Sequence, residues 1–203
     1  MSLKKRTPFV TLILAAIALA IHVLPGAATW LQFDRVAIAS GECWRLFSGH
    51  LTHWNTDHLF WDLLMFVVLG VLIEARSRTS LLWTILLATL IIATVAWLRG
   101  PGVQTYRGLS GIDTALFVFL ACSMIIEAIH LRQWHQCIVP GVLLVLAMGK
   151  FGYEAVTGST LFVDNQSADF VVFLEAHLVG VAVGALTATT FWPQISPKNA
   201  VPS

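Results

Sequence analysis

The sequence predicts an all-α polytopic membrane protein, a bundle of six transmembrane helices. The chain has 203 residues, of which 57% are hydrophobic and only 11% are charged, whereas a soluble domain has roughly 25% charged residues. Long apolar blocks alternate with short polar joints, as expected where roughly 17–25 residues at a time cross a bilayer. We therefore expect residues 1–203 to form a single membrane domain.

Six apolar segments have about the length of a membrane-spanning helix. They are Phe9 to Ala28, His58 to Ile73, Leu81 to Leu98, Ser110 to Ile129, Ile138 to Val156 and Phe170 to Trp192. The first follows basic residues, as a secretory signal does. Its length of roughly 20 apolar residues nevertheless favours a membrane helix over the shorter core of a cleaved signal.

An even number of spans places both termini on the same side of the membrane. On that side the sequence has seven of its twelve Lys and Arg residues, including Lys4, Lys5 and Arg6. Basic residues near helix ends favour the cytoplasm, so we expect both termini there. Residues 29–57 then form the first outer loop, whose tryptophans are suited to the headgroup region.

Composition argues against several other classes of protein. The formal net charge is +1, and no basic stripe suggests a nucleic-acid partner. The three cysteines form no CxxC pattern, so neither a disulfide framework nor a cysteine-based metal site is expected. His50, His53 and His58 invite a metal interpretation, but HExxH is absent and their spacing does not repeat on one helix face. We expect no metal and no other cofactor.

Ionisable residues inside a membrane are costly, so each one is a hypothesis about function. Asp62, Asp113 and His177 lie deep within predicted helices. Glu127 and Glu154 lie near predicted helix ends, where a long side chain can reach the interface. We therefore expect the first three to face the interior of the bundle, and the two glutamates to face water.

A serine lies between glycines in Gly108-Leu109-Ser110-Gly111, where a polar joint becomes an apolar helix. The free N–H groups and the dipole of a helix N-terminus favour a negative charge that develops there. Ser110 is therefore a candidate nucleophile with part of an oxyanion hole beside it. The alternative is an ordinary N-cap serine flanked by turn glycines.

Small residues recur at every fourth position of the last predicted helix, namely Ala176, Gly180, Gly184 and Ala188. Such a face lets membrane helices approach closely, and Gly111 and Ala115 offer a matching face on the Ser110 helix. This packing would bring His177 to the Ser110 hydroxyl, as general-base catalysis requires. The alternative is a histidine that only hydrogen-bonds a neighbouring helix.

A third element lies at the start of the second predicted helix. His58 and Asp62 are four residues apart and therefore share one helix face. That face is expected to point toward the same interior site.

Together these elements resemble the rhomboid family of intramembrane serine proteases. The GxSG motif of that family is matched by Gly108-Leu109-Ser110-Gly111, and its AHxxGxxxG motif by the segment from Ala176 to Gly184. Its WR motif is matched by Trp44-Arg45, and its ExR motif by Glu74-Ala75-Arg76. The resemblance covers nearly the whole chain after the first helix.

The resemblance implies that Ser110 is the nucleophile and His177 the general base of a dyad, and that His58 helps to stabilise the oxyanion. Two positions depart from the family pattern: Asp62 stands where Asn is common, and Thr114 where an aromatic residue is common.

An ionised Asp62 cannot donate a hydrogen bond to an oxyanion. We expect it instead to accept from His58 and orient that ring; a protonated Asp62 is the alternative. Asp113 either faces His177 as a third member of the site or makes a structural hydrogen bond.

The short form of the chain and the segment His-Trp-Asn-Thr-Asp-His resemble the rhombosortase branch of the family. That resemblance implies a bacterial inner membrane and single-span substrates with glycine-rich C-terminal tails. A rhomboid protease with other single-span substrates is the nearest alternative. Two other functions are also alternatives: an inactive rhomboid-like binder of membrane clients, and a small transporter.

Overall fold

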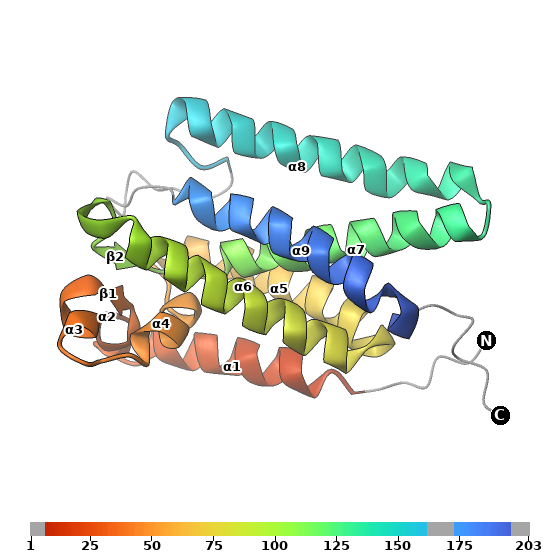
Figure 1. The fold of residues 1–203 in the computed structure, drawn as a ribbon. Helices are drawn as coiled ribbons and strands as arrows, with labels where there is room; N and C mark the ends of the chain where they lie inside the picture. Colours follow the sequence, from red (N-terminus) through yellow and green to blue (C-terminus); the bar gives the residue numbers. More distant parts are fainter. Residues whose placement is uncertain (1–6, 162–172, 196–203) are drawn as a thin grey trace.

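The computed structural model describes residues 7–161 and 173–195, with side chains through Phe191. It is an all-α bundle of long helices with a small folded loop region at one end (Figure 1). Within the described residues, five helices are long and apolar enough to cross a membrane. They are α5 (Thr56–Arg76), α6 (Arg78–Leu98), α7 (Ser110–His130), α8 (Ile138–Thr157) and α9 (Leu174–Ile195). The predicted all-α polytopic membrane bundle is thus confirmed.

The first predicted span is wrong in length. Helix α1 (Phe9–Val23) has 15 residues and ends before Leu24, whose backbone is extended because the next residue is a proline. Gly26 then adopts a left-handed φ of 78° and leads into α2 (Ala27–Leu31). At about 1.5 Å per residue, α1 is roughly 22 Å long, which is shorter than the hydrocarbon core of about 30 Å.

The other predicted spans agree with the observed helices to within a few residues. Helix α5 begins earlier than predicted, because the Asn55 side chain accepts a hydrogen bond from the His58 N–H (2.7 Å) and caps the helix. Helix α7 begins at Ser110, as predicted. The predicted start of the last span, Phe170, lies outside the described residues.

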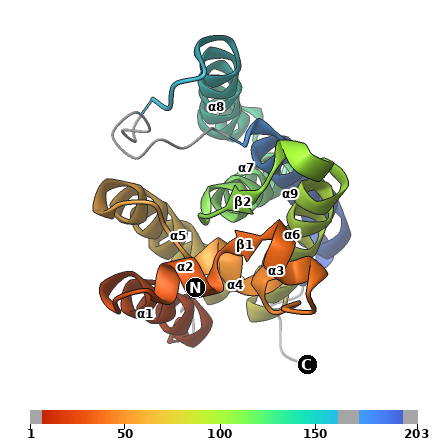
Figure 2. The same ribbon diagram turned by 90° about the vertical axis from the view of Figure 1, so that its left-hand side faces the viewer.

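The first loop, residues 29–57, folds into short elements at one end of the bundle (Figure 2). They are the end of α2, β1 (Phe33–Asp34), α3 (Arg35–Ala39), α4 (Arg45–Ser48) and the 3-10 helix η1 (Gly49–Leu51). Arg45, the arginine of the WR motif, is buried and donates to the carbonyls of Thr29 (3.0 Å) and Gln32 (3.2 Å). This arginine therefore holds the two halves of the loop together.

The first loop is joined to the segment that leads to Ser110. The joint between α6 and α7 contains η2 (Gly100–Gly102) and β2 (Thr105–Tyr106). β1 and β2 pair antiparallel, with Phe33 opposite Tyr106. At the other end of the bundle, η3 (Trp134–Cys137) connects α7 to α8.

Glu74 of the ExR motif fastens α5 to the first helix. Its carboxylate is fully buried and accepts from the backbone N–H groups of Val10 (3.1 Å) and Thr11 (3.0 Å) at the start of α1. Arg78 pairs with the same carboxylate at 2.9 Å. The first N–H groups of a helix have no partner within the helix and need such acceptors. Glu74 therefore satisfies the hydrogen-bonding groups at the N-terminus of α1.

Helix α7 lies at the centre of the bundle and α8 at its edge. Side chains such as Ala115, Leu116 and Phe119 of α7 are almost completely buried. Helix α8 stands apart from the other helices in both views (Figures 1 and 2), and only 11% of its span is buried. The site described below lies between this peripheral helix and the core of the bundle.

Candidate active site

Helices α7 and α9 pack closely beside the positions of Ser110 and His177. A Cβ atom added to Gly111 would lie 3.0 Å from the Cβ and carbonyl oxygen of Ala176. At Gly180 it would collide with the Gly111 carbonyl oxygen. The predicted contact between two small-residue faces is therefore confirmed. Ser110 and His177 each lie one residue from the Gly111–Ala176 contact.

All five residues predicted for the site line one cavity of about 690 Å³. They are Ser110, His177, His58, Asp62 and Asp113. Helices α5, α7, α8 and α9 form the walls, and the segment before Ser110 contributes at the loop end. The structure thus brings together residues that lie more than 100 positions apart in the sequence.

The turn before Ser110 requires a glycine. Gly108 has a φ of 121°, and a Cβ atom there would lie 2.8 Å from His58 Nε2 and 3.2 Å from Asp62 Oδ2. The Tyr106 hydroxyl donates to the carbonyl oxygen of Gly108 (3.1 Å). The backbone of the GxSG segment therefore lies directly on the His58 ring and leads into the first turn of α7.

Asp62 connects three parts of the site through one oxygen atom. Its Oδ2 accepts a hydrogen bond from the Leu109 N–H (2.8 Å) and lies 3.2 Å from the Nε2 atoms of both His58 and His53. The contact with His58 agrees with the expected orienting role. The contacts with His53 and with the backbone beside Ser110 were not anticipated.

His53 is a site residue for which the sequence analysis proposed no catalytic role. It is 1% exposed, and its ring packs edge-on against that of His58 with centroids 5.1 Å apart. Burial lowers the pKa of His53, although the nearby Asp62 carboxylate opposes this shift. Within residues 7–161 and 173–195, no three His, Cys, Asp or Glu side chains are arranged to hold a metal ion.

Arg107 ties the first loop to the segment before Ser110. Its guanidinium donates to Gln32 Oε1 (2.7 Å) and to the His53 carbonyl (3.2 Å), and lies over the Trp54 ring at 4.4 Å. Partial burial lowers the pKa of Arg107. The loop that carries His53 is therefore held against the cavity by a charged side chain two residues before Leu109.

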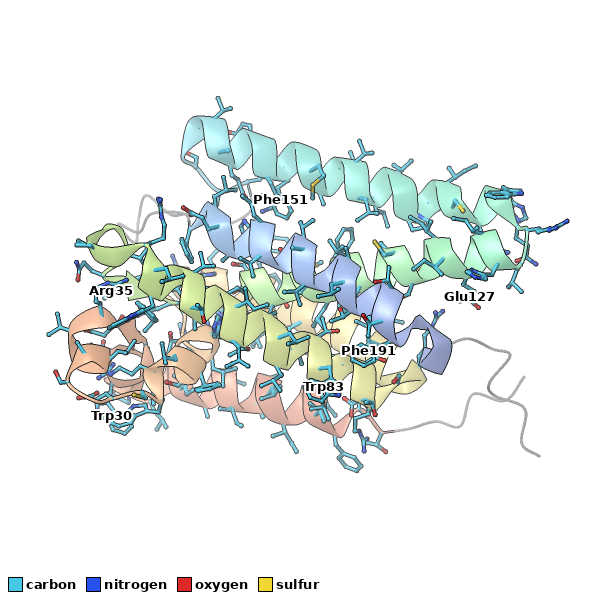
Figure 3. The ribbon with its side chains drawn as sticks, in the orientation of Figure 1. Trp30, Arg35, Trp83, Glu127, Phe151 and Phe191 are labelled. Carbon is cyan, nitrogen blue, oxygen red and sulfur yellow. The ribbon has the colours of Figure 1, made fainter. Side chains whose placement is uncertain are left out.

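An aromatic residue from α8 stacks on His177. The rings of Phe151 and His177 lie 4.8 Å apart with an interplanar angle of 19°. Figure 3 shows Phe151 on the side of α8 that faces α9. Thr114, which stands where the family commonly has an aromatic residue, donates its hydroxyl to the Ser110 carbonyl (2.8 Å) instead. Phe151 thus supplies an aromatic contact to the imidazole from another helix.

The expectation that Glu154 reaches water is wrong. Glu154 is 2% exposed, and its Oε1 accepts from Lys150 Nζ (2.7 Å) and from the Leu161 N–H (3.2 Å). Its Oε2 lies 3.8 Å from His177 Nδ1. The segment that follows α8 brings the Leu161 N–H to Glu154, so a side chain near the helix end is enclosed by protein. Glu127, by contrast, is partly exposed and pairs with Arg76 at 3.5 Å.

Asp113 lies in the cavity wall and is buried. Among the described residues, neither of its carboxylate oxygens has a hydrogen-bond partner. No ion pair joins Asp113 to His177 in that part of the chain, where the carboxylate nearest to Nδ1 belongs to Glu154. The geometry therefore supplies neither of the two contacts expected for Asp113.

Comparison with protein families identifies the chain. A model of the rhomboid domain matches residues 40–194, which include every residue that lines the cavity, from Trp54 to His177. The chain belongs to the rhomboid family. Rhomboids are generally intramembrane serine proteases that act on membrane-protein substrates within a bilayer. A search of curated proteins found no match. This rhomboid is accordingly an integral, multi-pass membrane protein.

Proposed function

We propose that this rhomboid is an active serine endopeptidase in which Ser110 is the nucleophile and His177 the general base. The observation that supports this most strongly is the close contact of Gly111 with Ala176, because these two residues are the sequence neighbours of Ser110 and His177. Both side chains also line the same cavity. Hydrolysis needs water at that depth, and a cavity of this size has room for it.

The chemistry follows from these positions. The Ser110 hydroxyl attacks the scissile carbonyl while His177 takes its proton, and the imidazole later gives that proton to the leaving amine. The N–H groups in the first turn of α7 face the developing oxyanion. His58, held 3.2 Å from Asp62 and packed under Gly108, contributes from the α5 wall. Water then releases the acyl group from Ser110.

The proposed substrates are single-span membrane proteins, with glycine-rich C-terminal tails as the favoured class. A helical substrate hides its carbonyl groups in internal hydrogen bonds, so the scissile stretch must unwind before Ser110 can attack it. Glycine makes unwinding easier, because its helix propensity is about 1 kcal/mol worse than that of alanine. The proposed location is a bacterial inner membrane, with both termini in the cytoplasm.

Labelling with a fluorophosphonate in detergent tests the proposal without knowledge of the substrate. Wild type should be labelled, whereas Ser110→Ala and His177→Ala should each lose labelling while remaining folded. Ser123→Ala is the matched control, because Ser123 is a buried serine on the same helix. Labelling that persists in Ser110→Ala would refute the assignment. A wild type that is never labelled would favour the inactive client binder.

A further inference from the structure

Two buried polar atoms face each other between α8 and α9. Glu154 Oε2 and His177 Nδ1 are 3.8 Å apart, and within the described residues neither has a hydrogen-bond partner. Buried polar groups are nearly always hydrogen-bonded in native structures. A movement of less than 1 Å would let these two atoms satisfy each other at the usual distance of about 2.9 Å.

The surroundings hold the Glu154 carboxylate in this direction. Its other oxygen, Oε1, is occupied by Lys150 Nζ and by the Leu161 N–H, which leaves Oε2 turned toward the imidazole. Phe151, one turn earlier on α8, stacks on the face of the same imidazole. Helix α8 therefore contacts His177 both on its face and at its Nδ1 edge.

We propose that Glu154 is the carboxylate partner of His177, a positioning residue that turns the proposed dyad into a Ser110–His177–Glu154 arrangement. This inference rests on the proposed function. The resemblance to rhomboids implied a dyad without a third carboxylate, and the sequence offered Asp113 as the candidate. The structure assigns the position to a residue of α8 instead.

The chemical consequence concerns the tautomer of the imidazole. A neutral imidazole carries one N–H, and which nitrogen holds it depends on the hydrogen bond that the other atom makes. If Nδ1–H donates to Glu154, the lone pair on Nε2 is free to take the proton from the Ser110 Oγ. The resulting imidazolium then lies against a carboxylate, which stabilises its charge without taking up the proton.

Charged groups on α8 and α5 act on this imidazole. Lys150 and Glu154 face it from α8, Asp62 and His58 from α5, and Asp113 lies in the α7 wall. On α9 itself, Glu175 is paired with Arg99 at 2.9 Å. Removing the charge of Glu154 leaves the positive charge of Lys150 without its ion-pair partner, which disfavours imidazolium. Removing Lys150 has the opposite effect.

The test is the pH profile of the rate at which a fluorophosphonate labels Ser110 in detergent. Glu154→Gln retains an oxygen that can accept from Leu161, so it removes mainly the negative charge. We expect its labelling rate at neutral pH to fall at least about tenfold, within the range that general-base catalysis contributes. We also expect the acid limb of its profile to move to lower pH, and that of Lys150→Gln to higher pH. Glu127→Gln, the same change at the opposite end of the bundle, should match wild type.

The outcomes separate this inference from the proposed function. If Ser110 of wild type is not labelled, the proposed function fails. If wild type is labelled but Glu154→Gln has an unshifted acid limb, even with a lower overall rate, Glu154 is only structural and the inference is overturned. Should Glu154→Gln fail to fold, Lys150→Gln decides, because an unshifted acid limb in that variant also overturns the inference.

Discussion

A single methyl group added at Gly180 should separate the two halves of the site. The Cβ of Gly180→Ala would collide with the Gly111 carbonyl oxygen and would lie 2.8 Å from Thr114 Cβ and 3.1 Å from the Ala115 N. Two of these three atoms belong to the backbone of α7, which cannot rotate away as a side chain can. The helices must therefore move apart, and they must do so one turn from Ser110.

The size of the effect follows from this geometry. Overpacking of a close contact costs about 1–3 kcal/mol, of which up to about 1 kcal/mol is offset because alanine favours a helix more than glycine does. We expect a net loss of roughly 1–2 kcal/mol in stability. A displacement of about 1 Å between catalytic groups can lower the rate about 10²-fold. Activity should thus fall more than stability.

The assay compares Gly180→Ala with Gly141→Ala on α8. A Cβ atom at Gly141 meets nothing within 4 Å, so the same substitution there should leave thermal stability in detergent unchanged or slightly raised. Fluorophosphonate labelling of Ser110 reports activity in both variants. Wild-type labelling by Gly180→Ala, or an equal loss in Gly141→Ala, would refute the argument that the α7–α9 contact positions the site.

Three further predictions concern the surroundings of the site. Asp62→Asn should retain partial labelling of Ser110, because an amide oxygen can still accept from the Leu109 N–H. In Asp62→Leu the labelling rate should fall at least about 10²-fold. Equal labelling of the two variants would contradict this prediction. Glu74→Leu should lower thermal stability by about 3 kcal/mol or more, because it leaves buried N–H groups of α1 unsatisfied. Burial lowers the pKa of His50 from 6.5 to about 4, so wild type should lose stability as pH falls from about 6.5 toward 4, by up to roughly 3 kcal/mol. In His50→Gln this decline should be smaller, as melting temperatures measured across that range would show.

Much of the fold could be predicted from the sequence, because hydrophobic length is a direct physical requirement of the bilayer. The predicted length of the first helix was wrong because hydrophobic length takes no account of residues that break a helix. The stretch from Phe9 to Ala28 is predominantly apolar, but Pro25 and Gly26 end the helix at Val23. The signal was present in the sequence as a proline–glycine pair. The fold of the first loop could not be predicted, since it depends on pairing with residues near Tyr106.

The candidate site was predictable where its residues lie in local motifs. Ser110 and His177 lie next to small residues, and the recurrence of small residues at every fourth position indicates a close contact between helices. His58 and Asp62 are four residues apart and share a helix face. Phe151 and Glu154 were not predicted as site residues, because each reaches the site through a contact with another helix. His53 lies close to His58 and Asp62 in the sequence, but the loop that carries it is held in place by the distant Arg107. For Glu154 the depth was inferred from its position near a helix end. Its burial depends on how residues 158–161 fold back, which no local pattern reveals.

Helix α8 contacts His177 in two ways. Thr114 stands on α7 where the family commonly has an aromatic residue, whereas the ring that stacks on the His177 imidazole belongs to Phe151 of α8. The carboxylate closest to His177 Nδ1 comes from the same helix. Yet α8 is the least buried of the long helices that the structure describes, with 11% of its span inside the bundle. In the proposed arrangement the orientation of His177 depends on a weakly packed helix, and any displacement of α8 from α9 removes the stacking and the carboxylate together.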